Sequence, residues 1–262
     1  MKKFVLFFFL TLALLLGGRT SAPAAPGLTE DQLRRMLEAH PDILLGVLQK
    51  HSEELLDLVQ SGATSRRNKA IVNEWRRSLK QPAPNVELRG RYIKGPEKAP
   101  LTIIAYSDFT CPFCQKGANT IRRILKERKD QVRYVFKAYP LDSKGFGRLA
   151  AAYFLAAGLQ SEAKAWKLHD LLFSSRAELV QDGEKTLKKM AAEAGLDLNR
   201  LAEDIKSARV NEMLDTDYAE GARLNLEGTP TYFINQLAVH GALAPELFDK
   251  AIEMALTTAP RP

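Results

Sequence analysis

The chain has few cysteines and histidines, the residues that bind structural zinc, and few cysteines to form disulfides. Its 262 residues include 2 cysteines, Cys111 and Cys114, and 4 histidines spread between positions 40 and 240. A structural zinc site takes four such ligands, often as two close pairs, and this sequence has no second pair. A disulfide across so short a spacing closes too small a loop to stabilise a fold appreciably. We therefore expect no metal site, and the cysteine pair needs another explanation.

Long apolar runs are absent beyond the first residues. Residues 4–16 are almost wholly apolar, Lys2 and Lys3 precede them, and the small-residue pattern A-P-A follows at 22–24. A membrane anchor needs about 20 apolar residues, so this short run favours a cleaved secretory signal peptide over residues 1–24. No cysteine lies at the expected cleavage site, which argues against a lipid anchor. We expect the mature protein in the periplasm, where disulfides persist.

A strong excess of charge of one sign is also lacking. The formal net charge is +7, and three of these charges lie in the predicted signal peptide, which leaves +4. Basic residues gather at 122–129 on a predicted helix, but Glu127 and Asp130 are mixed with them. We interpret this cluster as a solvated helix face and expect no nucleic-acid partner.

Residues 27–80 have a wholly helical pattern. Thr29 and Gln32 form a capping box, which begins a helix, and Pro41 suits the first turn of the next. A narrow heptad-like seam follows, formed by Leu44, Leu48, His51, Leu55 and Leu58. After Gly62, a further helix carries three apolar residues on one face, Ile71, Trp75 and Leu79. These faces either pack on the main domain or form a homo-oligomer through residues 27–80.

The rest of the chain has the pattern of an α/β domain, residues 90–258. The proline-rich segment 81–89 precedes it as a predicted linker. Strands at 101–109 and 131–139, with a helix at 112–129 between them, form a βαβ unit with parallel strands.

A helical block and a second pair of strands complete this domain. The block covers about 143–226, where Gly158 and Gly195 fit helix C-caps and Asp197 fits an N-cap. The closing elements are predicted as strands at 231–235 and 237–241 and a helix at 245–256.

The cysteine pair lies where a strand passes into a helix. Pro112 favours the first helical turn, so Cys111 falls at the helix N-terminus, where unpaired backbone N–H groups and the macrodipole stabilise an anion. A thiolate is the nucleophilic form of cysteine. Cys114 lies one turn further in and should be more buried. This arrangement favours a redox dithiol, with attack by Cys111 and resolution by Cys114.

Two stretches carry a family resemblance. "SDFTCPFC" (107–114) after a buried strand, together with "GTPTYFIN" (228–235), resembles the DsbA-like branch of the thioredoxin superfamily. The likeness covers roughly residues 90–258. It implies a thioredoxin-like fold with an inserted helical block, and a thiol–disulfide oxidoreductase with no cofactor beyond a redox-active Cys111–Cys114 disulfide. It also implies two kinds of partner: exported protein substrates and a membrane protein that resets the dithiol.

The resemblance assigns roles to further residues. Pro112 and Phe113 are the active-site dipeptide, and Thr229 and Pro230 match a cis-proline loop that faces the cysteines. The resemblance implies that the Thr229 backbone pairs with an extended substrate segment and that Pro230 protects the dithiol from metals. Because Phe113 lacks the charge of a histidine, we expect a weaker oxidant than proteins with a C-P-H-C sequence.

The chain also departs from the family pattern. Ala105 stands six residues before Cys111, where the family often has a buried acid that serves proton transfer. Lys137 matches a family lysine near that site and is our candidate for this role, with an ordinary exposed strand lysine as the alternative. Asp108 is a weaker candidate for polar support, with capping or solvation as its alternative.

Four functions remain open at this point. Threonine before the proline is a feature of the oligomeric isomerases DsbC and DsbG, and the N-terminal helices resemble the arm of ScsC-like proteins. These likenesses favour a disulfide isomerase or reductase. The alternatives are a DsbA-type oxidase and a Cu(I)-handling protein, because soft thiolates suit Cu(I). A binding module with incidental cysteines is a further alternative.

Overall fold

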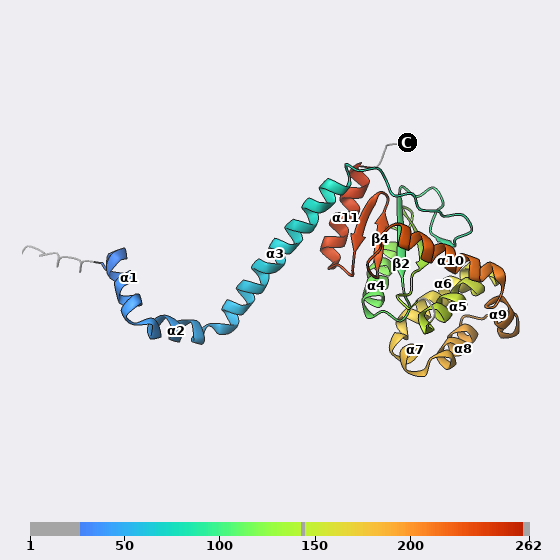
Figure 1. Cartoon of the computed structure of the whole chain (residues 1–262), viewed down its shortest axis with the longest axis horizontal. Helices are drawn as coiled ribbons and strands as arrows, with labels where there is room; N and C mark the ends of the chain where they lie inside the picture. The colour runs from blue at the N-terminus through green and yellow to red at the C-terminus, as the bar shows by residue number, and fades with distance from the viewer. Residues whose placement is uncertain (1–26, 143–144, 259–262) are drawn as a thin grey trace, which may run out of the picture. The chain divides into compact units, whose positions relative to one another are not determined.

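The computed structural model describes residues 27–142 and 145–258, which form two compact units with a boundary between Ala63 and Thr64 (Figure 1). The predicted signal peptide, residues 1–24, lies outside the described residues. Within the described ranges, no helix has both the length and the apolar composition that a membrane crossing requires.

The first unit is helical. Its helices are α1 (Glu30–Ala39), α2 (Pro41–Lys50) and the beginning of α3 (Ser52–Ser78). The capping box of Thr29 and Gln32 forms as predicted. The heptad seam is not carried by one continuous helix, because the backbone of His51 leaves helical geometry, with φ −112° and ψ 28°. Instead α3 runs through Gly62, where the sequence suggested a break.

The second unit begins within α3 and uses its apolar face. Val72 and Trp75 are buried and belong to the main hydrophobic core, and Ile71 and Leu79 pack against it. Of the two alternatives for the face of Ile71, Trp75 and Leu79, packing on the main domain is therefore confirmed.

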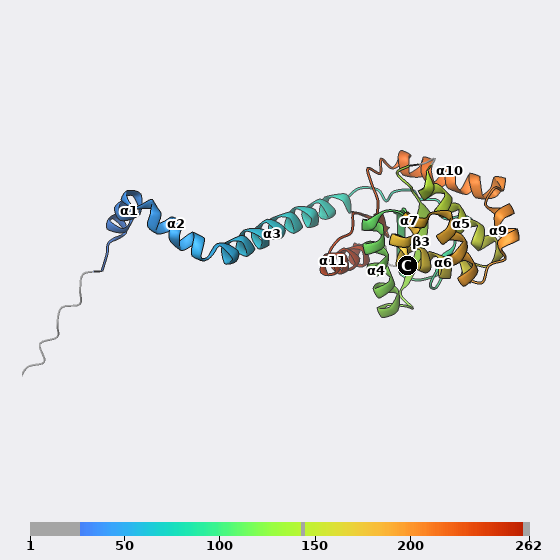
Figure 2. The ribbon, with the colours of Figure 1, turned by 90° about the horizontal axis from the view of Figure 1, so that it is seen from below.

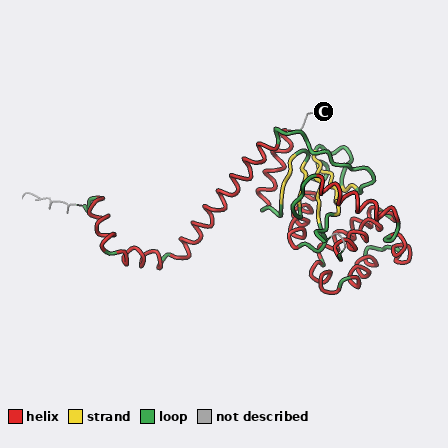
Figure 3. Tube along the Cα trace, viewed as in Figure 1, coloured by secondary structure: helices red, strands yellow, loops and turns green. Residues whose placement is uncertain are grey.

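A five-stranded sheet forms the centre of this unit, in the order β1-β3-β2-β4-β5 (Figures 1 and 3). The predicted βαβ unit is β2 (Leu101–Ser107), α4 (Pro112–Glu127) and β3 (Val132–Ala138), and its two strands pair in parallel. The other strands are antiparallel to their neighbours: β1 (Ile93–Lys94), β4 (Thr231–Ile234) and β5 (Leu237–His240). Helix α11 (Pro245–Thr258) follows β5.

In the described part of the segment between β3 and β4 there are six helices, namely α5 (Phe146–Gln160), α6 (Glu162–Ser174), α7 (Arg176–Asp182), α8 (Glu184–Glu193), α9 (Leu198–Asp204) and α10 (Ala208–Arg223). Gly195, with φ +80°, follows α8, and Asp197 caps α9, as predicted. The prediction for Gly158 was wrong, since it lies inside α5. A Cβ there would stand 1.9 Å from the Tyr92 ring, so close packing explains this glycine.

The two faces of the sheet have different coverings. In Figure 1 β2 lies between α4 and α10, and in Figure 2 β3 lies between them, so these helices cover opposite faces. Side chains alternate along β3, which places Tyr134, Phe136 and Ala138 in the α4-side core. Lys137 consequently points to the other face.

Lys137 is fully buried on the α10 face, so the alternative of an exposed strand lysine was wrong. Its ammonium group pairs with Glu220 and lies 3.4 Å from the Asp217 carboxylate. Arg91 pairs with Asp217 at 2.8 Å, and the Tyr106 hydroxyl donates to Glu220. These contacts tie α10 to β2, β3 and the segment that precedes β1.

Replacing Lys137 by methionine should destabilise the domain. Removing one partner of a buried ion pair leaves the other, here the Glu220 carboxylate, without its buried counter-charge, which costs about 3 kcal/mol or more. Urea unfolding of Lys137→Met should therefore have a clearly lower midpoint. Lys189→Met, which removes an exposed lysine paired with Glu178, is the control and should keep the wild-type midpoint. Equal midpoints for both variants would contradict the buried pairing.

Candidate active site

The two cysteines lie at the start of α4, directly after β2. Cys111 is the N-cap residue in extended conformation, with φ −76° and ψ 126°, and Pro112 is the first helical residue. Cys111 is half-buried, whereas Cys114, one turn later, is 1% exposed. Both thiols are free in this structure. A reagent can therefore reach the first sulfur and not the second.

The surroundings of Cys111 favour its thiolate. They lower its pKa to about 5, and the largest cause is a hydrogen bond that the Cys114 thiol donates to the Cys111 sulfur. Partial burial opposes this effect, while the backbone N–H groups of Cys114 and Phe113 and the Thr229 side chain add to it. The predicted contribution of the helix N-terminus is present, but the second cysteine contributes more.

Cys114 behaves in the opposite way. Burial, and then its hydrogen bond to Cys111, raise the pKa of the Cys114 thiol well above its ordinary value. The backbone N–H of Asp108 lies 3.4 Å from its sulfur, and the hydroxyls of Ser107 and Thr229 partly offset the rise. Cys111 is thus the anion of the pair, and Cys114 keeps the proton.

The loop at Thr229 and Pro230 lies against Cys111. The peptide bond between these two residues is cis, and the Thr229 carbonyl oxygen is 3.6 Å from the Cys111 sulfur. The structure therefore brings the stretch 228–235 next to the stretch 107–114, which carries the two cysteines. Ser107, which sequence analysis missed, also faces this site. Its position two residues after Ala105 on a strand was the available signal, because alternate residues share a face.

The other predicted site residues lie in different places. Phe113 is 56% exposed beside Cys111, with the Lys116 ammonium 5.8 Å from its ring centroid. The Asp108 carboxylate accepts hydrogen bonds from the backbone and hydroxyl of Thr110, both at 2.8 Å, so it caps the loop before Cys111.

Lys137 is not brought to the cysteines. It lies on the α10 face of the sheet, whereas Cys114 belongs to the core on the α4 face. The prediction that Lys137 serves proton transfer to Cys114 was therefore wrong. Neighbouring residues on a strand point to opposite faces, and the Lys137 side chain points away from the face that carries Cys114.

The hydrogen bond between the cysteines predicts how Cys111 titrates. Iodoacetamide alkylation of Cys111, measured by mass spectrometry between about pH 4 and pH 9, should have a midpoint near pH 5 in the wild type. Cys114→Ala removes the thiol donor and should raise this midpoint by about one unit or more. Cys114→Ser, the matched control, keeps a donor and should retain a lower midpoint than Cys114→Ala. An unchanged midpoint in Cys114→Ala would assign the effect to the backbone alone.

The sequence resembles known proteins over most of the second unit. Residues 88–254 match the family model described as thioredoxin. The chain is also 31% identical over 169 residues to "Na(+)/H(+) antiporter NhaA 3" of Salinispora tropica, a match that covers 64% of this chain and 25% of the antiporter. The chain thus spans about a quarter of the length of the curated relatives it matches.

Solved structures share the fold at low sequence identity. BdbD from Bacillus subtilis, in oxidised form, has a TM-score of 0.59 and 20% identity over 67% of this chain and 97% of its own. A periplasmic thioredoxin-like protein from Salmonella enterica serovar Typhimurium has a TM-score of 0.55 and 18% identity, covering 64% and 91%.

A linker-deletion mutant of ScsC from Proteus mirabilis has a TM-score of 0.56 and 16% identity, covering 91% of this chain and all of its own. These likenesses show a thioredoxin-like fold. The match of the family model covers more than half of the residues, and the chain belongs to the thioredoxin family.

Proposed function

We propose that the protein is a thiol–disulfide oxidoreductase that acts on exported proteins, with Cys111 as the attacking sulfur and Cys114 as the resolving sulfur. One observation carries this proposal: a reachable thiolate at Cys111 has a buried, protonated thiol one helical turn away. The family membership and the nearby Thr229–Pro230 loop support it.

The reaction has two exchange steps. The Cys111 thiolate attacks one sulfur of a substrate disulfide, a Cys111–substrate disulfide forms, and the other substrate sulfur leaves as a thiolate. Cys114 then loses its proton and attacks the Cys111 sulfur, which releases the second substrate thiolate and forms the Cys111–Cys114 disulfide. Two electrons pass to the substrate in this direction, and the reverse direction oxidises it.

The substrate surface includes the Thr229 loop and Phe113. Thr229 stands two residues before the start of β4, so an extended substrate segment can pair with its backbone as an added strand. The exposed Phe113 ring offers an apolar contact beside the nucleophile. Pro112, Phe113, Thr229 and Pro230 together form the proposed contact surface for substrates.

We favour an isomerase or reductase over an oxidase. The Cys111 pKa of about 5 lies between about 3.5 for DsbA and about 7 for thioredoxin. The thiolate of the reduced protein is therefore stabilised to an intermediate degree. The same value supports a DsbA-type oxidase as the second candidate, because any stabilisation of the reduced form makes the disulfide more oxidising. A membrane partner would reset the dithiol, and the periplasm is the proposed compartment.

Self-association through the first unit supports the isomerase. Neither α1 nor α2 has a buried residue, and large apolar side chains of this unit are exposed: Leu28, Leu33, Met36, Ile43, Leu44, Leu45, Val47, Leu48, Leu55, Leu56, Leu58 and Val59. A second copy of the chain presents the same apolar surface and is the proposed occupant. Several dithiols on one assembly would hold a misfolded substrate at high effective concentration.

Ribonuclease refolding separates the candidate activities. With scrambled ribonuclease, the protein should restore activity by reshuffling, and Cys111→Ala should abolish this because the nucleophile is lost. Cys114→Ala should accumulate mixed disulfides with the substrate. Activity on reduced ribonuclease alone would identify an oxidase, and inactivity on both substrates would reject the proposal.

Disrupting the exposed seam should dissociate the protein. The paired change Leu48→Glu and Leu55→Glu places charges on apolar positions and should shift the assembly to monomers in light scattering. Gln49→Glu with Gln60→Glu adds the same charge at polar positions and is the control. We expect the monomeric variant to lose isomerase activity while Cys111 alkylation is unchanged. A wild-type protein that is already monomeric would contradict the oligomer.

A further inference from the structure

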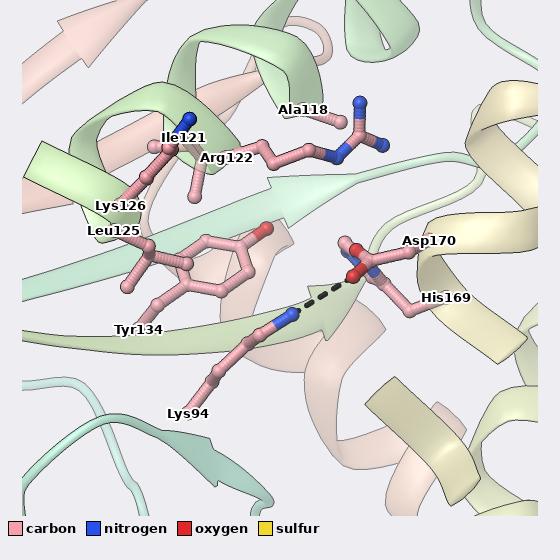
Figure 4. Close-up of a pocket in the computed structure, with 9 residues that line it drawn as sticks. All are labelled: Lys94, Ala118, Ile121, Arg122, Leu125, Lys126, Tyr134, His169 and Asp170. Atoms are coloured by element: carbon pink, nitrogen blue, oxygen red, sulfur yellow. Dashed lines mark hydrogen bonds and ion pairs between the residues drawn. The ribbon is translucent and has the colours of Figure 1, made fainter. Parts of the chain in front are cut away.

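A pocket separate from the dithiol is formed by residues of α4, β1, β3 and α6 (Figure 4). Its volume is about 250 Å³, and neither cysteine lines it. An apolar cavity of about 150 Å³ is large enough to bind benzene, so this space admits an organic molecule of about ten non-hydrogen atoms. One wall of the pocket is apolar and comes from α4, with Ala118, Ile121 and Leu125. The function proposed above makes no use of this pocket.

The hydroxyl of Tyr134 is a buried polar group of the pocket that lacks a partner. Tyr134 is 2% exposed, and in Figure 4 its hydroxyl points into the space between Arg122 and Asp170. This hydroxyl forms no hydrogen bond with any residue that the structure describes. Burial raises the pKa of Tyr134 well above its ordinary value, so the phenol keeps its proton and can donate it in a hydrogen bond. Buried tyrosine hydroxyls usually have a partner, and a molecule in the pocket would supply one.

The carboxylate of Asp170 is already engaged within the pocket wall. Its Oδ1 atom lies 2.9 Å from Nδ1 of His169, and its Oδ2 atom lies 2.9 Å from the Lys94 ammonium, which offsets its charge. Burial lowers the pKa of His169, so the imidazole adds no charge at pH 7. The His169 ring also packs against Tyr134, with 5.9 Å between the ring centroids. These contacts hold the wall around the Tyr134 hydroxyl in place.

Two cations of α4 complete the pocket, and no acid offsets them. Arg122 and Lys126 line it, and both are exposed at its rim. The Arg122 guanidinium donates to the neutral side chain of Asn119 at 2.9 Å, and neither cation forms an ion pair within residues 27–142 and 145–258. Together with Lys94, three cations therefore surround one carboxylate. The pocket has an excess of positive charge beside an unpartnered donor.

We propose that this pocket binds a small organic anion, namely a carboxylate on a short apolar body. The carboxylate accepts a hydrogen bond from the Tyr134 hydroxyl and lies within the field of Arg122, while the apolar body packs against Ile121 and Leu125. Phosphate fits less well, because it leaves the apolar wall in contact with water. A neutral molecule of the same shape also fits less well, because it gains nothing from the excess positive charge.

Titration calorimetry of the full-length protein with benzoate at pH 7 tests the proposal. We expect saturable binding of one benzoate per chain with a dissociation constant of about 1 to 10 mM, which is ordinary for a molecule of this size. Benzyl alcohol has the same ring without the charge, and it should bind about fivefold more weakly, as should phosphate. Because the cations of α4 are exposed, raising the NaCl concentration from about 0.05 to 0.5 M should weaken the binding of benzoate.

Variants of the pocket separate the hydrogen bond from the charge. Tyr134→Phe keeps the ring and removes the donor, so benzoate should bind about fivefold more weakly or worse. Arg122→Gln with Lys126→Gln removes both unpaired cations and should weaken benzoate by about fivefold. Arg128→Gln with Lys129→Gln is the matched control, since it removes the same two kinds of charge from residues that do not line the pocket. It should keep the wild-type affinity.

Several results would overturn the proposal. They are wild-type affinity in Tyr134→Phe, equal affinity for benzoate and benzyl alcohol, tighter binding of phosphate, and no saturable binding up to about 50 mM benzoate. Unchanged affinity in the Arg122 and Lys126 double variant would also overturn it. That variant changes exposed side chains only, so it remains a test even if Tyr134→Phe failed to fold. None of these results bears on the dithiol chemistry, because no cysteine takes part in the binding.

Discussion

The hydrogen bond from the Cys114 thiol to the Cys111 sulfur is the interaction on which the site depends. It requires one sulfur to be buried and protonated and the other to be accessible and ionised, and the first turn of α4 provides this separation. The bond lowers the pKa of one thiol and raises that of the other, so the two cysteines cannot exchange roles. The order of attack and resolution follows from this asymmetry.

The sheet keeps the charged structural contacts away from the dithiol. On the α10 face, Lys137 and Arg91 pair with Glu220 and Asp217 and hold α10 against the strands. On the α4 face, the core around Cys114 is mainly apolar and aromatic, and its polar groups include hydroxyls, backbone N–H groups and the pair of His169 and Asp170. Burial of the Cys114 thiol in this core, together with its hydrogen bond to Cys111, is what keeps the proton on Cys114.

Local features of the fold could be predicted from the sequence, whereas contacts between distant segments could not. The βαβ unit, the capping box at Thr29 and the N-cap position of Cys111 each depend on neighbouring residues. Gly158 was misassigned because its reason is the ring of Tyr92, over 60 positions earlier. Lys137 was misplaced because strand alternation gives opposite faces without saying which face α4 covers. The His169–Tyr134 contact likewise had no local signal.

The reduction potential of the Cys111–Cys114 pair tests the central claim most directly. A thiolate stabilised at Cys111 favours the reduced protein, so the disulfide should be more oxidising than that of thioredoxin, which is about −270 mV. Because the stabilisation is intermediate, the potential should remain below the value of about −120 mV for DsbA. Equilibration with glutathione buffers should give a value between these two. A potential at or below that of thioredoxin would contradict the account.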